Sequence, residues 1–216
     1  MNKIIGLITI IFLLTCPISC QKDAGKSQCD GDVAQVIRGK SVPKKISIYR
    51  YENFPISMAK DLEGKLKKFF PQVELKKKVL TLPNKHYYKA GNRYRATGLL
   101  DDLSKYRNRD AVLGLTDYII FTSNEKSKTW GIMGLSYVGT YKSVISSIIP
   151  KPGRQQTADN FCKLALHELG HGFGLNHCNN PRCFMIDAEG GMKFDKTPAF
   201  CNSCKSYLNA KGWTIP

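Results

Sequence analysis

Three of the chain's four histidines lie in one short stretch, His167–Cys183 (HELGHGFGLNHCNNPRC), together with one glutamate and two cysteines. Imidazole nitrogens and thiolates are the ligands that zinc prefers in proteins. Four ligands complete a tetrahedral zinc, so the stretch holds more of these groups than one ion can use. It therefore predicts metal binding, and its ligands must be divided between sites.

The spacing of the three histidines favours a single catalytic site. His167 and His171 lie four residues apart, which places both on one face of a helix, about 5.4 Å apart along its axis. Gly174 can adopt the left-handed conformation that ends a helix and turns His177 back toward the same ion. Three histidines leave the fourth position of a tetrahedral zinc open for water. Glu168 can accept a proton from that water, so the pattern predicts hydrolysis.

Four cysteines predict a second site of a different kind. Cys178 and Cys183 are followed by Cys201 and Cys204, of which the last two form a CxxC. Four thiolates make a closed site without a position for water, and such a zinc would tie the loop after the active helix to a helix that begins near Cys201. Two disulfides are the alternative, because an exported protein allows them. The spacing favours zinc.

Hydrophobic periodicity predicts the elements that must position these groups. The order is typical of an α/β domain with a twisted mixed sheet packed with helices. Gly170 and Gly172 each cost a helix about 1 kcal/mol relative to alanine, so we expect them to pack closely against the site. We expect strands at 46–51, 73–79, 111–121, 131–138 and 143–149, and helices at 58–70 behind a possible Ser57 cap, at 99–106, at 157–172 and from about 201 onward.

The N-terminal residues predict export. Lys3 precedes the apolar run Ile4–Leu14, which has the length of a signal-peptide core and is too short to span a bilayer. Cys20, which follows Ser19, resembles the lipidated cysteine of a bacterial lipoprotein signal. Cys16 is an alternative lipidation site, and an ordinary secretory signal with two incidental cysteines is the other interpretation. We expect Cys162, on the active helix, to be a small buried apolar group. Cys29 could be free or could pair with Cys162.

Composition limits the class of protein. At 216 residues with 42% hydrophobic residues, the chain suits one well-packed domain. The 33 Lys and Arg residues against 17 Asp and Glu residues give a formal net charge of +16, which favours acidic surfaces. The basic residues are scattered rather than gathered in a nucleic-acid motif, so we expect no specific nucleic-acid partner. We also expect the protein to be a monomer.

The combined pattern resembles the archaemetzincin family of metzincin zinc peptidases. HExxHxxGxxH is followed directly by Cys178, then by four residues, Cys183, one residue, Met185 and the later CxxC. The sequence departs from the family pattern in two ways: the interval between Met185 and Cys201 is slightly shorter, and an export signal is unusual for a mostly intracellular family. The resemblance implies a metzincin-like zincin fold, with an active-site helix followed by a zinc-stapled C-terminal region.

The same resemblance assigns roles to the site residues. His167, His171 and His177 would hold a catalytic zinc with Glu168 as general base, and Met185 would lie in the turn beneath this ion. A structural zinc would be held by the four cysteines Cys178, Cys183, Cys201 and Cys204. An edge strand beside the active helix would pair with an extended substrate, and Gly131–Tyr137 is the candidate. The alternative is that this strand has no ligand role.

Together these observations predict a zinc-dependent peptidase that acts on peptide or protein substrates and carries two zinc ions. We expect a signal peptide at 1–19, a flexible tether at 20–41 and one metallopeptidase domain at 42–216. The protein would reach the bacterial cell envelope, anchored to a membrane by a lipid on Cys20, or otherwise be periplasmic or secreted. The alternative function is a non-catalytic, zinc-stabilised peptide- or protein-binding module on the same fold.

Overall fold

The computed structural model describes residues 41–125, 127–151, 153–187 and 194–216 of the chain. The predicted signal peptide at 1–19 and all but the last residue of the predicted tether at 20–41 lie outside these residues, as do Cys16, Cys20 and Cys29. No helix in the described part of the chain combines the length and the apolar character needed to cross a bilayer.

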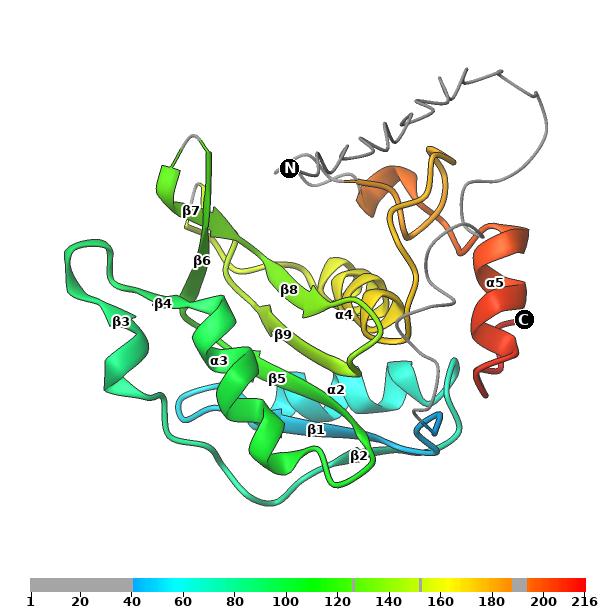
Figure 1. Cartoon of the computed structure of the whole chain (residues 1–216), viewed down its shortest axis with the longest axis horizontal. Helices are drawn as coiled ribbons and strands as arrows, with labels where there is room; N and C mark the ends of the chain where they lie inside the picture. The colour runs from blue at the N-terminus through cyan, green and yellow to red at the C-terminus, as the bar shows by residue number, and fades with distance from the viewer. Residues whose placement is uncertain (1–40, 126, 152, 188–193) are drawn as a thin grey trace, which may run out of the picture.

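A five-stranded sheet forms the centre of the fold (Figure 1). The strand order is β2 (Val73–Leu75), β1 (Ile46–Arg50), β5 (Ala111–Thr116), β9 (Lys142–Ser146) and β8 (Gly134–Tyr137). The first four of these strands run parallel to one another, and β8 pairs antiparallel with β9 at one edge. Every residue of β5 is buried, because elements pack on both faces of the sheet, which is why this strand is almost entirely apolar.

Helices cover the two faces of this sheet and divide its side chains between two apolar clusters. On one face, α2 (Ile56–Leu66) and α4 (Ala158–Gly172) pack against each other and against residues such as Ile46 and Ile48 of β1. On the other face, α3 (Ala96–Leu103) packs with Tyr49, which alternates with these isoleucines along the strand.

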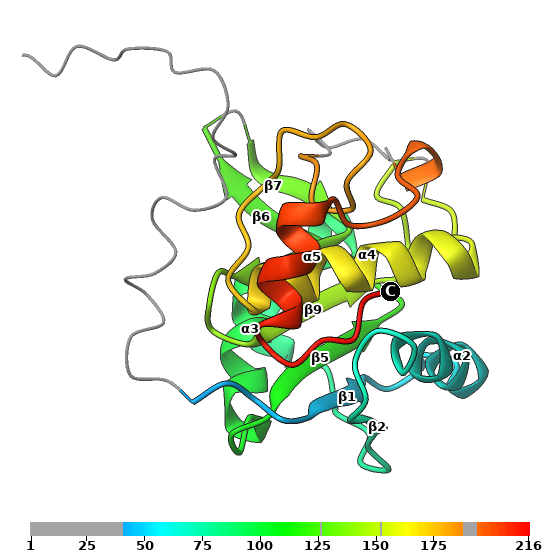
Figure 2. The same cartoon turned by 90° about the vertical axis from the view of Figure 1, so that its right-hand side faces the viewer.

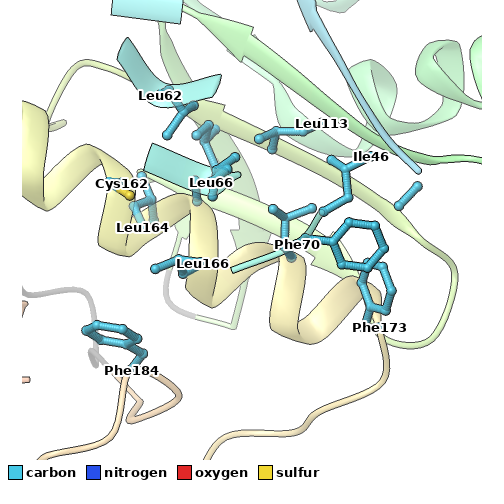
Figure 3. Packing of buried hydrophobic residues seen from close by; sticks show 14 of the residues in the cluster. Ile46, Leu62, Leu66, Phe70, Leu113, Cys162, Leu164, Leu166, Phe173 and Phe184 are labelled. Atoms are coloured by element: carbon cyan, nitrogen blue, oxygen red, sulfur yellow. The ribbon is translucent and has the colours of Figure 1, made fainter. Parts of the chain in front are cut away.

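The cluster between α2 and α4 is made of aliphatic and aromatic side chains (Figure 3). Leu62 and Leu66 of α2 approach the side chains of α4, and Phe70 and Phe173 pack with ring centroids 5.6 Å apart. Cys162 lies in this cluster and is 7% exposed, which confirms that it is a small buried apolar group. The active-site helix is therefore fixed along its buried side by the main core.

The C-terminal helix α5 (Asn202–Asn209) joins the same core (Figure 2). Tyr207 Oη donates to the carbonyl oxygen of Phe173, the residue that caps α4. The Trp213 ring also packs edge-on against Phe173, at 5.4 Å between centroids. These contacts place the C-terminal region against the end of the helix that carries the histidines.

A second, four-stranded sheet was not expected from the sequence. Two of its strands have only two or three residues, too short to give a periodic pattern. Four short 3-10 helices complete the described elements, at Asn84–His86, Lys89–Gly91, Ser104–Tyr106 and Phe194–Lys196. The strand order is β3 (Tyr87–Tyr88), β4 (Arg93–Arg95), β6 (Ile119–Asn124) and β7 (Ser127–Ile132).

This second sheet corrects two predicted strands. The single strand expected at 111–121 is two strands. Up to Thr116 the chain forms β5, which pairs with β9, and from Ile119 it forms β6, which pairs with β7. At the break, Tyr118 N donates to Thr116 Oγ1 and Ser146 Oγ donates to the Tyr118 carbonyl, which satisfies the backbone there. The strand expected at 131–138 is likewise divided at Met133 between β7 and β8.

Two helix boundaries also differ from the prediction. The first helix begins at Ile56 with Pro55 as its N-cap, so Ser57 is not the capping residue. Proline suits this end of a helix because its φ of −61° is already fixed and no donor is lost. The helix expected at 99–106 begins earlier, at Ala96, and ends at Leu103 before a 3-10 turn.

Candidate active site and metal centres

The helix α4 presents the first two histidines as the sequence predicts. It begins after Thr157, whose side chain accepts a hydrogen bond from Asn160 N (3.3 Å), a typical N-cap. It ends at Gly172, and Gly174 then adopts a φ of +111°, in the region that favours glycine. The chain turns back at this point, and His177 follows three residues later.

The three histidines converge on one point. Each offers one ring nitrogen, and these three atoms lie within 4.8 Å of one another. His167 Nδ1 donates to the Phe184 carbonyl oxygen and His171 Nδ1 donates to the Leu175 carbonyl oxygen, both at 2.7 Å. A carbonyl oxygen can only accept, so Nδ1 carries the proton in both rings and Nε2 has a free lone pair.

These nitrogens fit a zinc ion. Burial lowers the pKa of His167 to about 4 and that of His171 to about 3, so both rings are neutral at pH 7. Their Nε2 atoms lie 3.1 Å apart. Two nitrogens bound to one tetrahedral zinc at about 2.0–2.1 Å would lie roughly 3.3 Å apart. A cation between the two lone pairs therefore explains a contact that would otherwise be repulsive.

His177 completes the set from the loop after α4. Its ring centroid lies 4.8 Å from that of His171 and 5.5 Å from that of His167. Its Nδ1 is 3.5 Å from Asp187 Oδ2, so a carboxylate faces the side of the ring that a metal would not use. In contrast to the two helical histidines, His177 is exposed, and the site opens to solvent on its side.

Glu168 lies beside this site but is not one of the groups that converge on it. Its side chain points toward the edge strand β8, where Ser136 Oγ donates to Glu168 Oε2 (2.9 Å). Burial raises the pKa of the Glu168 carboxyl to about 7, and the Ser136 hydrogen bond acts in the opposite direction. A carboxyl with a pKa near neutrality is suited to accept and return a proton.

Met185 lies against α4, the helix that carries His167 and His171. It is fully buried, and its carbonyl oxygen accepts a hydrogen bond from Cys178 N (2.8 Å). A Cβ atom at Gly170 would come within 2.5 Å of Met185 Sδ. Close packing is thus confirmed for Gly170, which makes room for this methionine, whereas Gly172 packs against Ser143 and the backbone of Tyr141 and Lys142.

The four cysteines form a second cluster. Their four sulfur atoms lie within 4.8 Å of one another. Cys178 Sγ and Cys201 Sγ are 3.7 Å apart, whereas a disulfide would hold them at about 2.05 Å. Four thiolates at about 2.3 Å from a tetrahedral zinc would lie roughly 3.7 Å from one another. The geometry therefore suits a shared ion, and no disulfide is formed among the described cysteines.

Backbone groups of the loops also favour thiolates in this cluster. Cys183 Sγ accepts hydrogen bonds from Cys201 N (3.3 Å) and Met185 N (3.4 Å). A hydrogen bond from the Cys204 thiol lowers the pKa of Cys183 to about 5 and raises the pKa of Cys204. Burial raises the pKa of Cys178 to about 12. The backbone donors therefore favour the thiolate form of Cys183.

The structure gathers all eight residues predicted for the two sites, with Glu168 beside the histidines and the four cysteines in a cluster of their own. No pattern in the sequence indicated the groups that orient them. Ser136 holds the glutamate, and the carbonyl groups of Phe184 and Leu175 orient two imidazoles. These contacts join residues up to 32 positions apart, so no local pattern could have revealed them.

Comparison with known proteins agrees with this geometry. The sequence profile of peptidase family M54 matches residues 46–210. An archaemetzincin from Methanopyrus kandleri is 30% identical over 155 residues, which cover 70% of this chain and 86% of the relative. An archaemetzincin from Pyrococcus furiosus is 33% identical over 132 residues, covering 56% of this chain and 66% of the relative.

Solved structures show the same fold. The crystal structure of the Methanopyrus kandleri archaemetzincin has a TM-score of 0.64 and 25% identity, covering 80% of this chain and 97% of that one. The archaemetzincin of Archaeoglobus fulgidus, solved in complex with malonate, has a TM-score of 0.63 and 25% identity, covering 76% and 99%. The chain belongs to peptidase family M54, the archaemetzincins, and is a zinc metallopeptidase.

Proposed function

We propose that this chain hydrolyses peptide bonds at a zinc held by His167, His171 and His177, with Glu168 as the general base. The observation that carries the proposal is the convergence of three imidazole nitrogens beside a buried carboxyl group. Two of the rings are held by backbone carbonyl groups with Nε2 free. Such a set leaves one position of a tetrahedral ion for water or substrate.

Zinc bound there would supply Lewis-acid chemistry, activating a water and polarising the scissile carbonyl group. The chain's own contribution is the movement of a proton. Glu168 accepts the proton of the attacking water on its carboxylate and then delivers it to the nitrogen of the departing amine. The raised pKa of Glu168 makes both transfers accessible near neutral pH.

The edge strand β8 is the part of the site that we propose to bind the substrate backbone. Among the described strands it is an edge strand of the five-stranded sheet, and it packs against α4. An extended peptide can add to such an edge through main-chain hydrogen bonds, with little dependence on its sequence. Of the predicted segment Gly131–Tyr137, only Gly134–Tyr137 belongs to this edge, since Gly131 and Ile132 lie in β7.

The cluster of four cysteines is proposed to hold a second, structural zinc. It joins the loop that follows α4 to the N-terminus of α5, because Cys178 and Cys183 come from the loop and Cys201 and Cys204 from the start of the helix. Four sulfur ligands leave no position for water, so this ion would take no part in hydrolysis.

Removal of metal tests the proposed activity. Purified protein should cleave members of a fluorogenic peptide mixture, and dialysis against a chelator should lower the rate at least 100-fold. Some conditions of dialysis should remove only the histidine-bound ion. Adding one equivalent of zinc per chain to that sample should restore the rate of cleavage. Cleavage that persists after the zinc content has fallen to zero would contradict the proposal.

We further propose that the protein is exported and anchored by a lipid on Cys20, which lies outside the described residues. The support is the sequence alone: the apolar run Ile4–Leu14 ends shortly before this cysteine. Bacteria expressing the full chain in the presence of labelled palmitate should incorporate label. Cys20→Ser should abolish the incorporation, and loss with Cys16→Ser instead would move the anchor to Cys16.

A further inference from the structure

We propose that Ser136 is a positioning residue for peptide hydrolysis, because its hydroxyl group holds one oxygen of Glu168 and leaves the other to accept the proton. The inference rests on the proposed role of Glu168 as general base. It assigns a second role to β8. The side chains that face α4 would orient the base, while the backbone at the edge of the sheet would bind the substrate.

The alternation of β8 carries the first step of the argument. Leu135 and Tyr137 pack with the cluster on the α3 face of the sheet. Gly134 and Ser136 alternate with them and therefore face α4, where Glu168 lies. The two positions of β8 that face α4 are thus glycine and serine, and both lie against the carboxyl group of Glu168.

The hydrogen bonds around Ser136 allow its proton to serve the carboxylate. Its Oγ lies 2.9 Å from Glu168 Oε2, 2.8 Å from the Glu168 carbonyl oxygen and 2.8 Å from Ser143 Oγ. Ser143 Oγ also lies 3.1 Å from the same carbonyl oxygen. Each hydroxyl has one proton. When Ser143 donates to Ser136 Oγ, Ser136 donates its own proton to the carboxylate, so the two hydroxyl groups and the carboxylate form a chain of hydrogen bonds.

Glycine at position 134 fixes the other side of the carboxyl group. A Cβ atom there would lie 2.5 Å from Glu168 Oε1 and 2.6 Å from its Cγ. The glutamate side chain therefore occupies the space that any larger residue would fill. Within the described residues the Ser136 hydroxyl bonds Oε2, so Oε1 keeps both of its lone pairs for a proton.

Holding the carboxylate in one rotamer favours catalysis in a definite way. A glutamate side chain has several rotatable bonds, and freezing them in advance removes an entropy cost from the step in which the proton moves. A hydrogen bond to a charged acceptor is among the stronger ones in proteins. Loss of the Ser136 hydroxyl should therefore slow the chemical step and leave substrate binding unchanged.

Steady-state kinetics of Ser136→Ala on one fluorogenic peptide tests the proposal. We expect kcat to fall about tenfold or more, with KM changed less than about twofold and with zinc content and melting temperature unchanged. Ser136→Thr, which keeps the hydroxyl group, should recover most of kcat. Gly134→Ala should also lower kcat, because its Cβ would displace the same carboxyl group. Ser123→Ala serves as the matched control, because it removes a strand hydroxyl that donates to the Lys128 carbonyl, accepts from Arg95 and has no hydrogen bond to Glu168.

The double variant separates this proposal from the proposed function. If Ser136 acts through Glu168, Ser136→Ala should cause no further loss when Glu168 is already glutamine. An unchanged kcat in Ser136→Ala, or a loss that follows zinc content or melting temperature, would overturn the positioning role while leaving Glu168 as the base. A Glu168→Gln variant with the wild-type rate would instead overturn the proposed function itself.

Discussion

Glu168→Gln is expected to lower kcat by about 100- to 10,000-fold, the usual contribution of a general acid or base. Glutamine has nearly the same shape and its amide oxygen can still accept from Ser136, so the side chain should stay in place. It cannot take up a proton, and the reaction loses its base. Zinc content and melting temperature should equal those of the wild type, because the three histidines do not need the carboxylate.

The measurement is the rate of cleavage of a fluorogenic peptide by the wild type and by the variant, each with its zinc content determined. The same pair of proteins decides between a peptidase and a zinc-stabilised binding module on this fold. A module would bind the peptide equally well in both forms and cleave it in neither. Equal cleavage by both forms would remove Glu168 from the mechanism.

Cys204→Ser is expected to release the second zinc and to destabilise the C-terminal region. Cys204 is fully buried at the start of α5, and its sulfur faces those of three other cysteines. A serine hydroxyl is a poor zinc ligand, so the site loses its closed set of four thiolates. The free energy of unfolding should fall by about 4 kcal/mol or more, and the melting temperature by about 10 °C.

Calorimetry together with metal analysis measures both effects, and Cys162→Ser is the matched control. Cys162 is also buried, but it lies in the apolar cluster away from the four sulfurs, so its replacement should leave the zinc content unchanged. If Cys204→Ser kept two zinc ions per chain, the four-thiolate site would be wrong. If it lost one ion without any loss of stability, its structural role would be wrong.

The sequence predicted the site far better than the elements around it. His167, Glu168 and His171 are separated by fixed steps on a single helix, so helix geometry alone places these three. The turn after the helix was also predicted correctly. Gly174, three residues after His171, indicated a left-handed turn, and its φ is +111° in the structure. The cysteines also converge as predicted, although they come from separate segments.

What the sequence could not predict depends on strand pairing between distant residues. The run at 111–121 is apolar except at Thr116 and Asp117, which lie where β5 ends and before β6 begins. Two polar residues do not by themselves show that the chain changes its partner strands at this point. The break is stabilised by a hydrogen bond from Ser146 Oγ of β9 to the Tyr118 carbonyl oxygen, and only the structure reveals this contact. Ser136 is a similar case, because its importance comes from lying opposite Glu168, 32 residues away.

The most direct test of the central claim is the zinc content per chain of His171→Ala compared with that of the wild type. The wild type should contain two ions and the variant one, with peptide cleavage lost and the cysteine-bound ion retained. If the variant kept both ions, or cleaved peptides at the wild-type rate, the three histidines would not be the catalytic zinc site.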